Sequence, residues 1–197
     1  MKRPPVVLAA ALAVGALLLG ACGSATPGAA AIVGTERISE RQLSDAVANV
    51  LTSGGRPANT ANADLTRTVL DRMVKMALVN QVATRAGIVV TQGEIDRVIA
   101  DYQQQAGGAD AFNGVLLGQG IAPDQVDAAV RLNIQARKLS TAISPGADVQ
   151  AADQQLVATL AQYSSIVGTE ISPRFGSWNP QTLSVGDRPT DLSIYVG

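Results

Sequence analysis

Apolar residues recur at every third or fourth position over most of this chain, which is the spacing of one face of an α-helix. The first such stripe follows Ser39, which forms a capping box with Gln42, and it ends before Gly54. A polar segment that reaches Asn62 comes next, and we expect a loop there. The apolar members of this first helix are Leu43, Ala46, Val47, Val50 and Leu51.

A longer helix is predicted over Leu65–Ala86, with Asp64 as its N-cap and Gly87 as the left-handed residue that ends it. Two neighbouring apolar stripes run along this segment, so we expect a central helix with partners on more than one side. One stripe contains Leu65, Val69, Met73 and Met76, and the other contains Leu70, Val74, Ala77 and Leu78.

Cap residues, glycines and prolines divide the middle of the chain into four further helices. Thr91 and Glu94 form a second capping box, and Ser144-Pro145-Gly146 is a clear stop. The predicted helices run from Thr91 to Gly107-Gly108, from Asp110 to Gly118, from Pro123 to about Leu139 and from about Val149 to Ser165.

Two short segments have an extended rather than a helical pattern. Ala31–Val33 is a short apolar run before a Gly-containing turn, and Ile171–Trp178 follows the last helix. Residues 181–197 are thin in apolar side chains, so we expect a loosely held tail. The predicted fold class is therefore mainly α, with about six helices and a small two-stranded β element.

The N-terminus has the three parts of a secretory signal. Basic residues occupy positions 2 and 3, Val6–Leu19 is an uncharged apolar run of 14 residues, and small residues follow it. This run is shorter than the roughly 20 residues that a membrane-spanning helix needs, so a retained anchor helix is the weaker interpretation. Leu19-Gly20-Ala21-Cys22 resembles a bacterial lipobox, in which the cysteine is lipidated and becomes the first residue after cleavage.

Lipidation of Cys22 would divide the chain into four parts. Residues 1–21 would be the signal peptide, 22–30 a flexible Gly/Pro-containing tether, 31–180 the folded domain and 181–197 the tail. Because a lipoprotein of this kind carries more than one acyl chain, its attachment to the membrane would be stable. The alternative is a chance cysteine beside an ordinary cleavage site.

Composition excludes many activities. The chain has no histidine and a single cysteine, so it cannot assemble a Ser-His-Asp or Cys-His nucleophile, a His-ligated metal site or an internal disulfide. It contains neither a phosphate-binding loop nor a calcium loop motif, and we expect no metal and no cofactor. The formal net charge is −1 and no basic run is present, which gives no support to nucleic-acid binding.

The order of these pieces resembles the N-terminal domain of SurA-type periplasmic chaperones, and the corresponding part of PrsA-type lipoprotein foldases and trigger-factor-like relatives. Three stretches carry the resemblance: residues 30–39 with their strand, turn and capped helix, residues 70–96 with the long helix and the next cap, and residues 112–139 with the short helix, Gly120-Ile121-Ala122-Pro123-Asp124 and the following helix.

The resemblance implies a helical chaperone module, in which the segment after the last helix returns to the opening strand and Ile171–Trp178 pairs with Ala31–Val33. The family usually continues into a parvulin-type prolyl isomerase domain of roughly 90 or more residues. Fewer residues than that follow Ile143, and the histidines of parvulin sites are missing. We therefore expect a module that lacks the parvulin domain and is not an enzyme.

Four side chains are candidates for peptide binding, although each has a simpler structural interpretation. Met73 and Met76 could belong to an adaptable surface, while methionine on such a stripe usually lies in the core. Phe112 and Trp178 are aromatic residues of the kind that dominate interfaces; Phe112 fits a core position better, and Trp178 is evenly balanced between the two interpretations.

Three functions of different class follow. The leading hypothesis is a lipid-anchored extracytoplasmic chaperone, an ATP-independent holdase on the outer face of the plasma membrane, or in the periplasm if an outer membrane exists. Its partners would be unfolded or emerging polypeptides, and a homodimer is left open. The second is a cell-surface lipoprotein that recognises one dedicated partner. The third and weakest is a parvulin-type prolyl isomerase.

Overall fold

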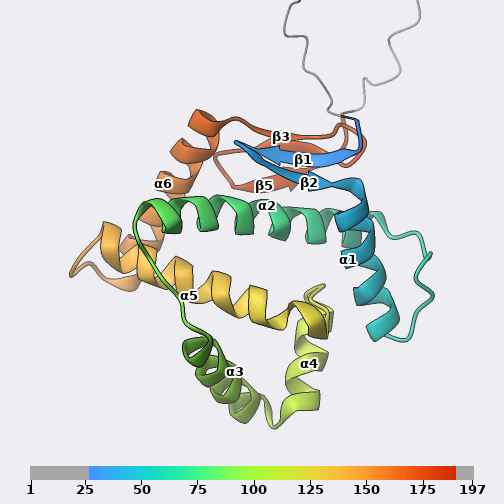
Figure 1. The fold of residues 1–197 in the computed structure, drawn as a ribbon, viewed down its shortest axis with the longest axis horizontal. Coiled ribbons are helices and arrows are strands. Elements are labelled where there is room, and N and C mark those ends of the chain that lie inside the picture. Colours follow the sequence, from blue (N-terminus) through green and yellow to red (C-terminus); the bar gives the residue numbers. More distant parts are fainter. Residues whose placement is uncertain (1–26, 190–197) are drawn as a thin grey trace, which may run out of the picture.

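Helices form most of this protein, and a small β layer covers one side of them (Figure 1). The computed structural model describes residues 27–189, so the expected signal peptide, Cys22 and residues 190–197 of the expected tail lie outside the described residues. In this range the elements are β1 (Ala29–Val33), β2 (Glu36–Ser39), α1 (Glu40–Ser53), α2 (Ala63–Arg85), α3 (Gln92–Ala106), α4 (Ala109–Gly118), the 3-10 turn η1 (Pro123–Gln125), α5 (Val126–Ile143), α6 (Val149–Val167), β3 (Thr169–Ile171), β4 (Ser177–Asn179) and β5 (Ser184–Gly186).

Both predicted capping boxes are present. The Ser39 Oγ accepts a hydrogen bond from the Gln42 backbone N–H at 3.1 Å, and the Gln42 Oε1 accepts one from the Ser39 N–H at 2.8 Å. Thr91 and Glu94 make the same reciprocal pair at the start of α3. Each box satisfies N–H groups that have no partner inside the helix. The six predicted helices are confirmed over the described range.

The start of α2 differs from our prediction. Asn62, rather than Asp64, is the N-cap, and its Oδ1 accepts a hydrogen bond from the Leu65 N–H at 2.9 Å. Asp64 lies inside the first turn, where a carboxylate is favoured by the helix dipole, and it pairs with Arg67. The predicted left-handed residue at the end is confirmed, since Gly87 has φ +67°.

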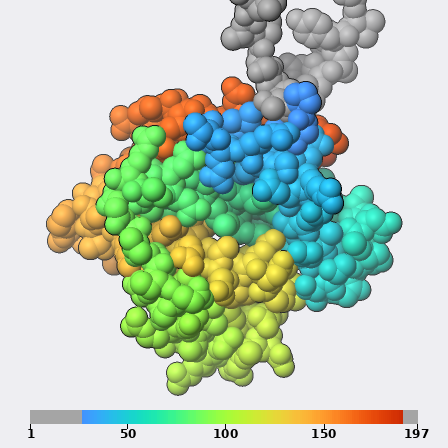
Figure 2. Space-filling view, viewed as in Figure 1, coloured from blue at the N-terminus to red at the C-terminus, as the bar shows by residue number. Residues whose placement is uncertain are grey.

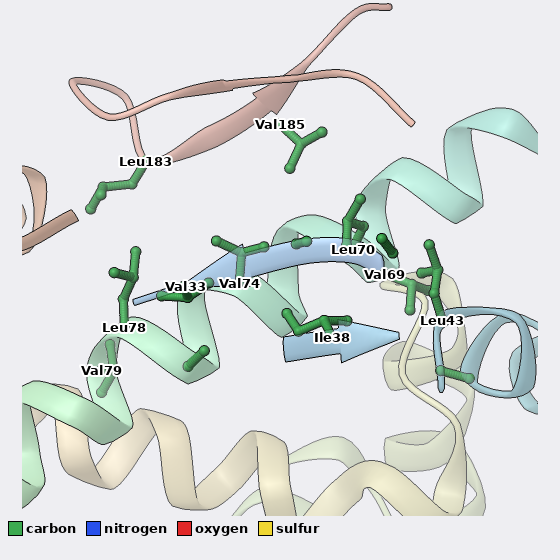
Figure 3. Packing of buried hydrophobic residues seen from close by; sticks show 14 of the residues in the cluster. Val33, Ile38, Leu43, Val69, Leu70, Val74, Leu78, Val79, Leu183 and Val185 are labelled. Carbon is green, nitrogen blue, oxygen red and sulfur yellow. The ribbon is translucent and has the colours of Figure 1, made fainter. Parts of the chain in front are cut away.

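The helix α2 is the central element, as its two apolar stripes predicted. It packs against the β layer on one side, against α5 on the other, and against α1 and α6. Figure 3 shows its side chains meeting those of β1, β2 and β5. The fully enclosed residues of this main cluster include Leu70, Val74 and Leu78 from α2, with Val33 and Leu43 from β1 and α1.

The sheet has three strands rather than the expected two, and its strand β1 begins at Ala29 rather than at Ala31. Strands β2, β1 and β3 form an antiparallel sheet in that order. Ala29 and Ala30 belong to β1 and are buried, so the expected tether cannot reach residue 30. The strand β2 was not predicted, because its four residues contain only one buried apolar side chain, Ile38.

The segment after α6 does return to the opening strand, but only its beginning pairs there. Ile171 pairs with Ala31 and Thr169 with Val33. Trp178 does not continue this strand; it pairs with Val185 in the separate two-stranded sheet of β4 and β5. The expected single extended segment over Ile171–Trp178 is therefore two strands, separated by a turn.

Residues 181–189 form part of the fold, which corrects the expected loose tail. Leu183 and Val185 are 6% and 7% exposed and belong to the main cluster. The Val185 N–H donates to the Asp71 carboxylate of α2 at 2.9 Å, and Asp187 pairs with Arg67. Two apolar side chains suffice because both belong to the main cluster and β5 packs against α2.

A second, smaller cluster forms the core of an arm made by α3 and α4 (Figure 1). Figure 2 shows this arm projecting from the body on the side opposite the sheet. The arm is held mainly through α5, whose Val126, Val130 and Ile134 lie in the arm cluster. Further along the same helix, Leu139 lies in the main cluster.

Replacing Leu183 by alanine tests whether the C-terminal hairpin belongs to the core. We expect the free energy of unfolding of the L183A variant to fall by about 2–5 kcal/mol, because a buried leucine loses its contacts and leaves a cavity. Urea unfolding followed by circular dichroism measures this. The control is Val89→Ala at an exposed valine, which should change stability by less than about 0.5 kcal/mol. Equal effects would show that the hairpin is not part of the core.

Candidate functional site: the groove between α5 and α6

Two basic side chains of α5 fix the connection between α2 and α3. The Arg131 guanidinium donates to the Val90 carbonyl at 2.9 Å, and the Lys138 ammonium donates to the Val89 carbonyl at 2.8 Å. Lys138 also pairs with Glu94 of the α3 capping box at 2.6 Å. Because these carbonyls lie outside any helix or strand, the basic side chains supply the partners that they would otherwise lack. The arm is thereby fastened to α5 by polar contacts as well as by its core.

The same contacts lower the pKa of Glu94. Hydrogen bonds from Lys138 and from the Thr91 backbone N–H favour the ionised carboxylate and bring its pKa from 4.5 to about 2. A carboxylate whose pKa is lower in the folded state stabilises the fold above its ordinary pKa, and this contribution disappears as the pH falls towards the folded value. The contact between α3 and α5 should therefore persist under mildly acidic conditions.

A groove of about 880 Å³ lies on the other flank of α5, where that helix turns back into α6. The turn between the two helices contributes Ser144, Gly146 and Ala147 to its lining. The Asp148 carboxylate then caps α6 by accepting a hydrogen bond from the Ala151 N–H at 2.9 Å. The groove is lined by Asn133, Ala136, Arg137, Ser140, Thr141, Ser144, Gly146, Ala147, Val149, Ala152, Asp153, Leu156 and Val157.

The groove has an apolar floor and a polar rim that includes two charged residues, Arg137 and Asp153. Ala152 and Leu156 of α6 are buried at its base, while Val149 and Val157 are 79% and 44% exposed. The α5 side of the groove presents Asn133 and several hydroxyl groups. Exposed valines beside a concave surface indicate a place where apolar segments can bind.

Charged groups in this groove are few and are engaged within the domain. The Asp153 carboxylate accepts a hydrogen bond from the Ser140 hydroxyl at 3.1 Å. The Arg137 guanidinium donates to the Tyr102 hydroxyl at 3.1 Å, towards the arm. Asp153 is the one charged residue in the whole of α6, a helix of 19 residues. Both partners are neutral hydroxyls, so Asp153 and Arg137 keep their charges at the edge of an otherwise uncharged site.

The four side chains that we singled out for peptide binding lie elsewhere. Phe112 is buried in the arm, with its ring centroid 6.2 Å from that of Tyr102. Met73 is partly buried against the main cluster, and Met76 is half-buried one turn further along α2. Trp178 is half-buried and its Nε1 donates to the Ser164 hydroxyl at 2.7 Å. The structure does not bring these four together on one surface.

The sequence did contain one indication of the groove. The segment that forms α6 combines exposed valines with glutamines and almost no charge, whereas the other long helices carry several charged residues on their exposed sides. Surfaces that remain in water are usually rich in charge, and interface cores are depleted of it. The count of charged residues in each predicted helix distinguishes the α6 segment from the other long helices.

No group of three or more Cys, Asp or Glu side chains within residues 27–189 is arranged to hold a metal ion. No helix in the same range is long and apolar enough to cross a membrane.

Removing the Lys138 ammonium tests the cause of the lowered pKa of Glu94. In the wild-type protein, an NMR titration of the Glu94 side-chain carboxyl carbon should have its midpoint near 2. In Lys138→Met we expect that midpoint to rise towards 4.5, since the largest source of stabilisation for the carboxylate is gone. Lys75→Met, which removes the ammonium paired with Asp71 instead, should leave the Glu94 midpoint unchanged. An unchanged midpoint in the Lys138 variant would assign the low pKa to the capping box alone.

Comparison with known proteins agrees with the fold described above. Residues 5–140 match the family model of the SurA-like N-terminal domain. No curated protein and no solved structure matches the chain. The matched range includes the sheet strands β1 and β2, the arm and most of α5, whereas α6 and the strands after it lie beyond it. Because this match covers more than half of the sequence, the chain belongs to the SurA-like N-terminal domain family.

Proposed function

We propose that this protein is a lipid-anchored extracytoplasmic holdase that binds unfolded secreted or envelope proteins in the groove between α5 and α6. SurA-like N-terminal domains are of chaperone type and bind unfolded polypeptides in general. The observation that carries the proposal is the open groove of about 880 Å³ with exposed valines at its edge. Apolar burial there would give modest, promiscuous affinity of the kind that a holdase needs.

Binding of this kind needs no chemical step. The sequence contains no histidine and no phosphate-binding loop with which to use ATP. A holdase instead binds unfolded chains reversibly and so lowers their free concentration by mass action. A client that dissociates can then fold in solution. The proposed activity therefore depends on the exposed apolar area and on the shape of the groove.

The proposed anchor would hold the domain close to the membrane. Six residues separate Cys22 from the start of β1 at Ala29. Fully extended, they span roughly 20 Å at about 3.3–3.6 Å per residue. The described chain starts on the sheet side of the molecule, opposite the arm (Figure 1). A lipidated Cys22 would thus place the β layer nearest to the bilayer and point the arm away from it.

A charge placed in the groove should weaken holdase activity. We expect the full mature chain to suppress light scattering by a chemically unfolded protein, and Val157→Glu to lose most of that effect, because a carboxylate beside the apolar floor would be desolvated by a bound segment. Val115→Glu adds the same charge at an exposed valine on α4 and is the control. Equal suppression by both variants would place the client site elsewhere, and no suppression by the wild type would exclude the holdase.

The number of partners separates the holdase from its alternative, a surface protein with one dedicated partner. Crosslinking in cells should yield many unrelated unfolded chains if the protein is a holdase. A single stoichiometric partner would favour the alternative.

Replacing Cys22 tests the anchor. We expect Cys22→Ser to abolish incorporation of labelled palmitate and to move the protein from the membrane fraction to the soluble fraction, because acyl chains supply the binding free energy. Ser24→Ala changes a nearby residue without removing the thiol, and this control should remain membrane-bound. If the Cys22 variant stays in the membrane fraction, the apolar run at Val6–Leu19 is retained as the anchor instead.

A further inference from the structure

A second concave surface, which we call the α3–α5 pocket, lies between those two helices. This pocket of about 320 Å³ is lined by Glu94, Arg97, Val98, Asp101, Ile134, Arg137 and Lys138. Its apolar members are Ile134, which is buried, and Val98, which is half-buried. Arg137 lines this pocket and also the groove between α5 and α6, so the two surfaces meet at that side chain.

The two arginines of the α3–α5 pocket are held by neutral partners. The Arg97 Nε donates to the Gly93 carbonyl at 3.0 Å, and the Arg137 Nη2 donates to the Tyr102 hydroxyl at 3.1 Å. Within residues 27–189, neither guanidinium has a carboxylate oxygen within 4.0 Å. Each guanidinium carries five N–H groups in a planar fork. In the described part of the chain, most of these donors therefore make no hydrogen bond.

The acidic side chains of the α3–α5 pocket leave these donors open. Glu94 is paired with Lys138 at 2.6 Å, so those two charges offset each other. Asp101 is exposed, one helical turn after Arg97, and makes no ion pair within the described residues. Three basic and two acidic side chains line the pocket, and both basic groups that lack an acidic partner are guanidinium groups.

We propose that the α3–α5 pocket binds the carboxylate of an acidic side chain in the client, while the neighbouring groove binds apolar residues of the same segment. This inference rests on the proposed function and defines its substrate class as apolar segments that contain Asp or Glu. Arg97 and Arg137 donate to the carboxylate, and such charge-assisted pairs are stronger than hydrogen bonds between neutral groups. Asp101 repels the same carboxylate and so keeps the affinity moderate.

The charges around the groove also orient the segment. Asp153 on the α6 wall keeps its negative charge, whereas Arg137 belongs to the α5 wall. An acidic client side chain is therefore repelled from the α6 wall and attracted to Arg97 and Arg137. We expect the acidic residue on the arm side of α5, with the apolar residues against Leu156 and Val157.

Three matched peptides test this inference on the full mature chain. Each is a capped, fluorescent segment of valines and serines, identical except for one position after the apolar run, which is glutamate, glutamine or lysine. We expect the glutamate peptide to bind about fivefold more tightly than the glutamine peptide at about 0.05 M salt. This preference should fall below about twofold at about 0.5 M salt, where exposed charges are screened. Equal binding of these two peptides at low salt, or tighter binding of the lysine peptide, would overturn the inference.

Arginine variants locate the bound carboxylate. Arg97→Gln should reduce the preference for glutamate over glutamine to less than about twofold, because one of the two donors is gone. Arg41→Gln changes an exposed arginine of α1 outside both surfaces, removes the same charge from the protein, and should keep the wild-type preference. A wild-type preference in Arg97→Gln would overturn the inference, since the carboxylate would then bind elsewhere.

Removing the opposing charge gives the converse test. Asp101→Asn should raise the preference for the glutamate peptide by about twofold, because the repulsion of the bound carboxylate is lost. Asp45→Asn, at an exposed aspartate of α1, makes the same change of charge outside both surfaces and should leave the preference unaltered. Equal preferences in these two variants would contradict the assignment of the carboxylate to the α3–α5 pocket.

The outcome for the holdase is measured separately, by suppression of light scattering. Suppression by the wild type, combined with equal affinity for the glutamate and glutamine peptides, would refute carboxylate recognition and leave the proposed function standing. Absence of both aggregation suppression and peptide binding would refute the proposed function itself.

Discussion

The burial of α5 on two sides is the constraint on which the rest of the structure depends. Every fourth residue from Val126 to Ile134 lies in the arm cluster, whereas Leu139, with Leu132 and Ile143 partly buried beside it, belongs to the main cluster. These two sets occupy different faces of one helix, because a turn contains 3.6 residues. The face that remains carries Asn133, Arg137 and Ser140 and becomes one wall of the groove. None of the α5 residues that line the groove belongs to the arm cluster, and among them only Ala136 packs against the main cluster.

The roles of the basic side chains of α5 follow from this arrangement. The basic residues Arg131 and Lys138 lie seven positions apart, and both reach the carbonyls that join α2 to α3. Lys138 also neutralises Glu94 and lowers its pKa to about 2. Two of the positive charges of α5 therefore fasten the arm and do not point into the groove. Of the three basic residues of α5, only Arg137 lines the groove.

Local signals in the sequence were sufficient for the helices but not for the short strands or the site. Capping boxes and the left-handed Gly87 act through neighbouring residues, so Ser39 with Gln42, and Thr91 with Glu94, could be identified directly. Strand β2 and the hairpin around Leu183 contain too few apolar residues to show a period, and α2 determines their burial from far away in the sequence. The placement of Phe112 and Trp178 likewise depends on tertiary partners. The groove needs the approach of α5 to α6, which no local pattern encodes.

The family match covers one wall of the groove but not the other. The α5 wall lies almost wholly within the matched residues 5–140, and its position is fixed by the two clusters and by the contacts to the arm. The α6 wall lies beyond that range and supplies the exposed Val149 and Val157 beside the buried Leu156. One wall is therefore held in place by the shared fold, while the other supplies the exposed valines. Since substitutions on the exposed side of α6 need not disturb either core, binding preference can change there without loss of the fold.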